Sequence, residues 1–185
     1  MYNYLEEYNR KLIDTSEVIK LIKPNSWIEY GFGAGFPPTI DEEIANRIEE
    51  LENVKLRMGW SLYKPATAGK DLTQEHLILH AYFVSAYLRK FVKQGLCSPL
   101  PRSFGDSGKV YREALKDSVD VAFVTVTSMD KHGYFNFGAA CSQNRALCDV
   151  AKTVVLEVNE GQPWACGGYN ETIHISEVDY IVQSK

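Results

Sequence analysis

The chain has 185 residues and a mass of 20.9 kDa, which is enough for one domain with a full hydrophobic core. Hydrophobic residues make up 45% of it, which excludes disorder, and the net charge of −4 excludes an electrostatic footprint for nucleic acid. No apolar run approaches the roughly 20 residues that span a bilayer. The first residues carry no basic leader, so we expect a cytoplasmic protein.

Helix-like and strand-like segments alternate along the chain. We expect, in chain order, a helix at 14–21, a strand at 27–32, a helix at 40–51, a strand at 54–62, an apolar segment of ambiguous type at 74–84, a helix at 86–94, a loop or edge strand at 97–104, a short helix at 109–116, a strand at 119–127, a turn at 130–138, a helix at 139–152, a strand at 153–158, and a last strand or pair at 172–175 and 180–182. The strand at 119–127 is almost continuously apolar or β-branched, as a parallel strand covered on both faces would be. This alternation predicts an α/β fold, a mostly parallel sheet with helices on both faces.

A glycine-rich loop, Gly31-Phe32-Gly33-Ala34-Gly35-Phe36-Pro37-Pro38, follows the first strand. Its three glycines allow positive φ and a close approach of the backbone to a ligand, and its two prolines stiffen the exit. At the carboxyl end of a strand, such a loop directs backbone N–H groups into the crevice where α/β proteins bind small molecules. A tight strand-to-helix turn without a ligand is the alternative.

The familiar glycine loops fit this segment poorly. A dinucleotide fingerprint needs glycine where Phe36 stands and an acidic residue near 53–56, so a nicotinamide-dependent oxidoreductase is disfavoured. The Lys-Ser/Thr of a P-loop is absent. Thr39 and Glu42 form a capping box that opens an acidic helical turn, which disfavours phosphate. Backbone donors without strong positive charge suit a carbonyl that becomes an oxyanion, as in acyl transfer.

A second group of polar residues follows the buried strand. Asp130, His132 and Asn136 lie there among aromatic residues and glycines. Asp130 and Gly133 fit a tight turn, and the aromatic side chains could belong to the core. In the functional interpretation, His132 or Asn136 donates a hydrogen bond to a bound acyl group or carboxylate.

The cysteines and histidines give no metal-binding pattern. The four cysteines, none of them in a C-x-x-C pair, are expected to be reduced and mostly buried: Cys97, Cys141, Cys148 and Cys166. Cys141 and Cys148 should share one face of the helix at 139–152. His76 and His80 are four residues apart but have no acidic third ligand nearby, so we expect no metal.

Together these segments resemble the family I CoA-transferases. They are most similar to the acetyl-CoA hydrolase/transferase branch, which includes butyryl-CoA:acetate and 4-hydroxybutyrate CoA-transferases. The matching pieces have the order and spacing of the family's amino-terminal half: 7–23, 31–37, 120–122, 129–138, 156–160 and 173–182. The forms at 132–138 and 174–179 look most like the butyryl-CoA:acetate type, whereas 63–107 fits less well and leaves the acyl chain length open.

The resemblance implies a fold, a reaction and a missing part. Residues 1–185 would be the amino-terminal domain, with the NagB/RpiA-like fold, of an enzyme that moves coenzyme A between short-chain carboxylic acids through a glutamyl-CoA thioester. The nucleophilic glutamate is expected in a carboxy-terminal half that is absent from this chain and acts in cis or in trans. No catalytic residue is therefore expected here, and Glu157 and Glu177 are not expected to be the nucleophile.

The resemblance also implies which residues bind the substrate. Those implied to line or shape an acyl or carboxylate pocket at the domain interface are Gly33, Ala34, Gly35, Pro37, Asp130, His132 and Asn136. Acyl-CoA and a short-chain carboxylate are the expected ligands, without metal, nucleic acid or membrane. An exposed apolar face for the second half, and a homo-oligomer, are expected as well. The alternative is an inactive module of the same fold that binds a carboxylate or a partner protein.

Overall fold

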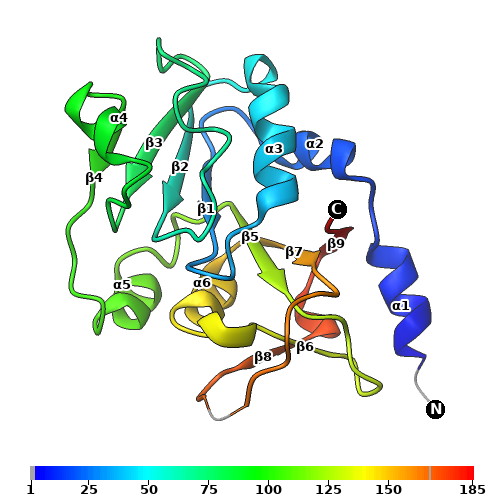
Figure 1. The fold of residues 1–185 in the computed structure, drawn as a ribbon. Helices are drawn as coiled ribbons and strands as arrows, with labels where there is room; N and C mark the ends of the chain where they lie inside the picture. The colour runs from blue at the N-terminus through cyan, green and yellow to red at the C-terminus, as the bar shows by residue number, and fades with distance from the viewer. Residues whose placement is uncertain (1–2, 167) are drawn as a thin grey trace.

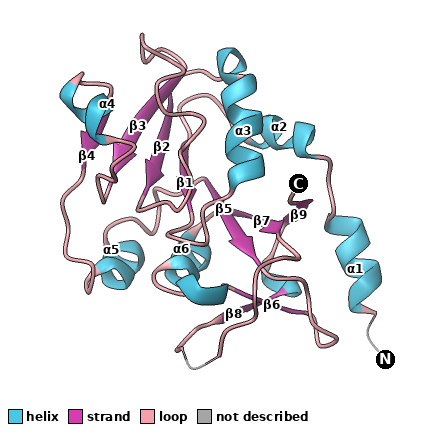
Figure 2. Cartoon of the chain, in the orientation of Figure 1, coloured by secondary structure: helices cyan, strands magenta, loops and turns pink. Residues whose placement is uncertain are grey.

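The computed structural model describes residues 3–166 and 168–185. Seven strands form one sheet in the order β4-β3-β2-β1-β5-β7-β9, and each strand is parallel to its neighbours (Figures 1 and 2). The strands of this sheet are β1 (Trp27–Tyr30), β2 (Val54–Met58), β3 (Leu77–Ala81), β4 (Cys97–Pro99), β5 (Val121–Val126), β7 (Thr153–Val158) and β9 (Tyr180–Gln183). A separate antiparallel pair consists of β6 (Tyr134–Asn136) and β8 (Thr172–His174).

Helices pack on both faces of the sheet. Among the described residues, the α-helices are α1 (Tyr4–Lys11), α2 (Val18–Leu21), α3 (Pro38–Asn46), α4 (Arg89–Lys93), α5 (Ser107–Glu113) and α6 (Asn144–Val150). The short 3-10 helices there are η1 (Thr15–Glu17), η2 (Ile48–Glu50), η3 (Gly138–Ala140) and η4 (Ile175–Glu177). Alternate side chains of β5 enter two cores, one beneath α2, α3 and α4 and the other beneath α5 and α6. The predicted α/β fold with a mostly parallel sheet is therefore confirmed.

The structure differs from the predicted elements at α1 and in the segments that form β6, β8 and β9. Helix α1 was not predicted, because its eight residues are largely polar. It is held by tertiary contacts, since Lys11 Nζ donates to the carbonyl oxygens of Ile175 and Val178 at 2.7 and 2.6 Å. The segment 130–138 is a strand as well as a turn. Its partner is β8, so β8 and β9 belong to different sheets.

Several predicted boundaries were also too long. The strands expected at 27–32 and 54–62 end at Tyr30 and Met58, because the backbone then turns to form the loops at the carboxyl edge of the sheet. The helix expected at 139–152 is η3 followed by the shorter α6. The ambiguous segment at 74–84 contains β3, and the edge strand β4 lies within 97–104.

The start of α3 shows a cap that the sequence did not reveal. The predicted capping box at Thr39 is wrong, because the helix begins at Pro38 and Thr39 lies inside it. The buried carboxylate of Glu157, on β7, accepts the N–H groups of Thr39 and Ile40 at 3.1 and 3.0 Å. Its Oε1 also accepts the hydroxyl of Ser184 at 2.9 Å. Glu157 therefore satisfies the helix N-terminus, where a negative charge is favoured.

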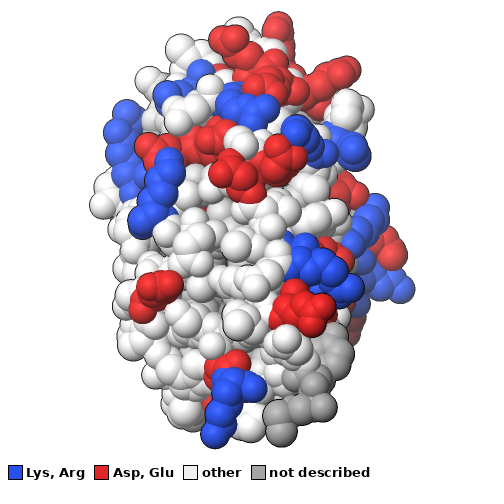
Figure 3. Space-filling model, turned by 90° about the vertical axis from the view of Figure 1, so that its right-hand side faces the viewer, with Lys and Arg blue, Asp and Glu red and all other residues white. Residues whose placement is uncertain are grey.

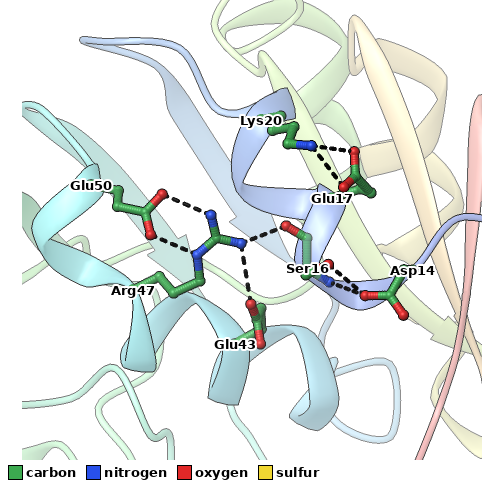
Figure 4. A network of polar contacts seen from close by, with 7 residues as sticks. All are labelled: Asp14, Ser16, Glu17, Lys20, Glu43, Arg47 and Glu50. Atoms are coloured by element: carbon green, nitrogen blue, oxygen red, sulfur yellow. Dashed lines mark hydrogen bonds and ion pairs between the residues drawn. The ribbon is translucent and has the colours of Figure 1, made fainter.

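Surface charges fasten the opposite end of α3 (Figure 4). The Arg47 guanidinium pairs with Glu50 at 2.7 Å and Glu43 at 3.4 Å, and it donates to the carbonyl oxygen of Ser16 at 2.6 Å. Figure 3 shows charged side chains gathered toward the top of this side of the molecule, at the height of α2 and α3, above a largely uncharged middle. Each exposed pair contributes at most about 1 kcal/mol.

We predict that Glu157→Gln lowers the free energy of unfolding by about 1–3 kcal/mol, because the new amide nitrogen would face a backbone donor. Urea denaturation measures the change. Glu49→Gln, an exposed glutamate on the 3-10 helix η2, is the matched control and should change it by less than about 0.5 kcal/mol. Equal effects of the two substitutions would contradict the capping role of Glu157.

Candidate functional site

The glycine loop doubles back directly after β1. A Cβ added at Gly31 would lie 2.3 Å from the carbonyl oxygen of Gly35, so the two backbones approach too closely for a side chain. Gly33 has φ +64°, which favours glycine. Pro37 is buried and precedes the first turn of α3. The expected need for glycine in this loop thus has a steric reason at Gly31 and a conformational one at Gly33.

Most of the loop's amides already donate within the chain. Among the described residues, five are used in this way: Gly31 to the carbonyl of Phe123 (2.9 Å), Phe32 to Asn144 Oδ1 (2.7 Å), Gly33 to the carbonyl of Trp60 (2.7 Å), Gly35 to that of Phe32 (3.0 Å) and Phe36 to that of Gly33 (3.3 Å). On the carbonyl side, Thr125 donates its N–H to Gly35 and its hydroxyl to Phe36, both at 2.8 Å. Between residues 32 and 36, only the N–H of Ala34 has no acceptor among the described residues.

The loop forms one wall of an open apolar pocket of about 480 Å³. The described residues that line it are Phe32, Gly33, Ala34, Trp60, Leu62, Phe104, Ala139, Ala140 and Ser142. The ring of Phe32 lies 5.2 Å from that of Phe104 and 6.3 Å from that of Trp60, measured between centroids. Among these lining residues there is no ionisable side chain, so the pocket suits an uncharged group.

Large apolar side chains also form an exposed rim at this edge of the sheet. Trp60, Leu62 and Phe104 are 40%, 51% and 61% exposed although they line the pocket. They come from the segments that follow β2 and β4. Exposed apolar groups gathered in this way are typical of a surface that binds a ligand or another protein.

A buried ionic cluster lies in the sheet next to this site. The Glu29 carboxylate pairs with Arg57 Nε at 2.8 Å and accepts the hydroxyl of Tyr111 from α5. Arg102 stacks on the ring of Tyr82 at 3.4 Å. Burial raises the pKa of Glu29, and Arg57 opposes this shift. The cluster anchors α5 and the segment before Phe104 to β1 and β2.

The polar residues after β5 have structural partners. The carboxylate of Asp130 accepts the backbone N–H groups of His132 and Tyr134, both at 2.8 Å, which builds the turn. The buried side chain of Asn136 donates to the carbonyl oxygen of Ala165 at 2.9 Å and accepts the N–H of Gly138 at 2.7 Å. The His132 side chain is exposed. The described residues that line the pocket do not include Asp130, His132 or Asn136.

The histidines and cysteines also have ordinary surroundings. His76 Nδ1 lies 2.8 Å from the carbonyl oxygen of Leu51. Cys141 precedes α6, so the prediction that it shares a helical face with Cys148 is wrong. All four cysteines are free. Cys97 and Cys148 are buried, Cys141 is half-buried and Cys166 is exposed. Within residues 3–166 and 168–185 there is no group of three side chains placed to hold a metal ion.

Sequence reasoning missed the residues that complete the pocket. Trp60 and Leu62 follow β2 as an apolar segment, and this pattern could have indicated a site wall at the carboxyl edge. Asn144 carried no signal, because its role depends on contact with a loop 112 residues away in sequence.

In the described part of the chain, no helix is both long and apolar enough to cross a membrane.

The family of the chain follows from comparison with known proteins. The model of the acetyl-CoA hydrolase/transferase N-terminal domain matches residues 1–185, so the chain belongs to this family and the resemblance is confirmed. Two relatives are a probable butyrate:acetyl-CoA coenzyme A-transferase of Syntrophomonas wolfei, 41% identical, and the butyryl-CoA:acetate CoA-transferase of Anaerostipes caccae, 35% identical. The alignments cover 98% and 99% of this chain but only 40% and 41% of the relatives' length.

Solved structures show the same fold. RipA from Yersinia pestis has a TM-score of 0.85 at 24% identity, covering 99% of this chain and 44% of that chain. The 4-hydroxybutyrate CoA-transferase of Porphyromonas gingivalis has a TM-score of 0.71 at 23% identity, covering 98% and 41%. The arrangement of the sheet is therefore that of the amino-terminal part of these proteins.

We predict that Gly35→Ala destabilises the chain by about 1–3 kcal/mol, because overpacking forces the backbone or its neighbours to move. The added Cβ would lie 2.3 Å from Asn144 Nδ2. Gly105→Ala is the control, since its Cβ would meet nothing closer than 3.8 Å. Thermal unfolding compares the two variants, and equal midpoints would contradict the close packing of the loop.

Asp41 holds the segment that follows the pocket wall at Trp60 and Leu62. Its carboxylate accepts the hydroxyl of Thr67 at 2.7 Å and the backbone N–H of Ala66. Burial raises its pKa from 3.8 to about 6. The folded chain therefore binds this proton more tightly than the unfolded chain does. Its stabilising effect is complete below pH 4 and is lost as the pH rises through 6.

The free energy of unfolding of the wild type, relative to that of Asp41→Asn, should fall by up to about 3 kcal/mol between pH 4 and pH 7. Urea denaturation at each pH measures both proteins, and their difference removes the contributions of other groups. A difference that is constant over this range would show that Asp41 does not titrate as described.

Proposed function

We propose that the chain is the amino-terminal domain of an acyl-CoA:carboxylate CoA-transferase of the butyryl-CoA:acetate type. One observation carries the proposal: the glycine loop gives an apolar pocket of about 480 Å³ a wall in which the Ala34 amide lacks an acceptor among the described residues. Such a pocket can hold an acyl chain against apolar walls while one N–H group faces its carbonyl oxygen. The two relatives whose names state this reaction, or a close variant of it, support the choice.

The reaction would be covalent catalysis by a carboxylate. A glutamate attacks the thioester carbonyl carbon, the C–S bond breaks, and the CoA thiolate leaves behind a mixed anhydride. The thiolate then attacks the glutamyl carbonyl and releases the donor acid, which gives a glutamyl-CoA thioester. An incoming acetate is activated by the reverse sequence. In each addition an oxyanion forms, and Ala34 N–H would be one of its donors.

The attacking glutamate is expected outside this chain. Among the described residues that line the pocket there is neither Asp nor Glu. Glu157 is committed to the start of α3, and Glu177 pairs with Arg145 and caps η4. These partners support the expectation that a carboxy-terminal half, in cis or in trans, supplies the nucleophile and most contacts to CoA.

The backbone of Lys185 lies close to the glycine loop. The N–H of Lys185 donates to Thr39 Oγ1 at 3.2 Å, at the first turn of α3 and thus beside the exit of the glycine loop. The exposed rim of Trp60, Leu62 and Phe104 is the surface we expect the second half to cover. In the isolated chain the same rim would favour self-association into a homo-oligomer.

The pocket also favours one class of acid. Its described walls hold no cation that could pair with a second carboxylate, and burying an unpaired charge is costly. We therefore expect aliphatic monocarboxylates such as butyrate to be preferred over succinate as the acyl group. Within that class, we expect the width of the pocket between Trp60 and Phe104 to limit the length of the acyl chain.

The test is a transferase assay with butyryl-CoA and acetate, in which acetyl-CoA is measured by mass spectrometry. The chain alone should give no turnover. The chain mixed with the separately expressed second half of the Syntrophomonas relative should give turnover, and succinyl-CoA should be a poorer donor than butyryl-CoA. The intact relative serves as the positive control.

Turnover by the chain alone would contradict the proposal, because the nucleophile would then lie within these residues. Glu177→Gln and Glu157→Gln would identify it. If the two halves form a stable complex that lacks activity while the intact relative is active, the proposed function is wrong. The inactive carboxylate- or partner-binding module would then describe the chain.

A further inference from the structure

Asn144 connects the two walls of the apolar pocket. One wall is the glycine loop at Phe32, Gly33 and Ala34, and the other is the segment that contains Ala139 and Ala140. The side chain of Asn144 is completely buried at the first turn of α6. Its Oδ1 accepts the N–H of Phe32 at 2.7 Å, and its Nδ2 donates to the carbonyl oxygen of Ala140 at 2.6 Å.

The packing around this amide is tight. A Cβ at Gly35 would lie 2.3 Å from Asn144 Nδ2, and a Cβ at Gly33 would lie 3.2 Å from the Cβ of Ala140. The two walls are thus in close contact beside the pocket, with a single side chain that bonds to both. A shift of the amide by a few tenths of an ångström would move the loop, because the glycines leave no slack between them.

The side chain of Asn144 also determines which loop amide remains for a ligand. Asn144 takes the N–H of Phe32, and Gly33, Gly35 and Phe36 donate to carbonyl oxygens of the chain. This pattern leaves the N–H of Ala34 without an acceptor among the described residues. Without the amide of Asn144, the N–H of Phe32 would lose its acceptor and the loop could adopt other hydrogen-bonding patterns.

We infer that Asn144 is a positioning residue for the acyl-binding pocket. It fixes the spacing of the two walls and the conformation in which Ala34 N–H can donate to the carbonyl oxygen of an acyl thioester. This inference rests on the proposed function, because it assigns Asn144 a role in binding the acyl group. Asn144 itself touches no reacting atom.

The test is NMR spectroscopy of the ¹⁵N-labelled chain with butyryl-CoA as the probe and CoA as the comparison. In the wild type, butyryl-CoA should shift the Ala34 amide signal, whereas CoA should not. Asn144→Ala should weaken the binding of butyryl-CoA about fivefold or more, as expected for the loss of buried hydrogen bonds. Hydrogen exchange of the Phe32 amide should become faster in the same variant.

Two further variants separate positioning from stability. Asn144→Asp keeps an acceptor for Phe32 but cannot donate to Ala140, so it should retain the slow exchange of the Phe32 amide and still bind butyryl-CoA more weakly. It also replaces Asn144→Ala if that variant does not fold. Val18→Ala removes core volume from α2, away from the pocket walls, and should lower stability without changing affinity.

The outcomes distinguish this inference from the proposed function. If the wild type gives no shift at Ala34 with butyryl-CoA, the proposed function of the pocket fails and the positioning role fails with it. If the wild type binds and the Asn144 variants bind equally well while folded, only the positioning role is overturned. Weakening by Val18→Ala to the same extent would also overturn it, since a general loss of stability would explain the effect.

Discussion

Buried polar groups hold the backbone of the glycine loop, and the shape of the pocket depends on them. Asn144 binds Phe32 at the loop's start, Thr125 binds Gly35 and Phe36 in its middle, and Glu157 binds the first turn of α3 at its exit. Each of these groups comes from a different part of the chain. These contacts act together with the ring of Phe36, which is buried in the core. Among the described residues they leave one loop amide, that of Ala34, without an acceptor.

Dependence on contacts between distant parts of the chain also explains how much of the molecule could be predicted from the sequence. The β-branched run at 119–127 identified a strand buried on both faces, and β5 is buried throughout. The short helix α1, the strand β6 and its pairing with β8 were missed, because long-range contacts and not local periodicity stabilise them. Local capping reasoning failed at Thr39 for a similar reason, since a carboxylate 118 residues away supplies the cap.

Part of the candidate pocket could be predicted from the sequence, and the binding role of its residues stays a prediction. The glycine loop was identified, and its residues Gly33 and Ala34 line the pocket. Asp130 and Asn136 were expected at the pocket's mouth, but their side chains are used to build a turn and to hold the segment at 165. Turn-forming and ligand-binding uses of Asp and Asn have the same sequence pattern, so only the three-dimensional partners separate them. The aromatic wall came from segments far apart in sequence, which no local motif could bring together.

The position of the bound acyl group tests the proposed role of the pocket most directly. Isotope-filtered NOE measurements on the chain with butyryl-CoA labelled with ¹³C in the acyl chain would show which protein protons surround its methyl group. If the acyl group lies in the pocket, we expect NOEs from that methyl group to the rings of Trp60 and Phe104 and to the methyl group of Ala140. NOEs to a different surface would contradict it, as would saturable binding without NOEs to these three residues.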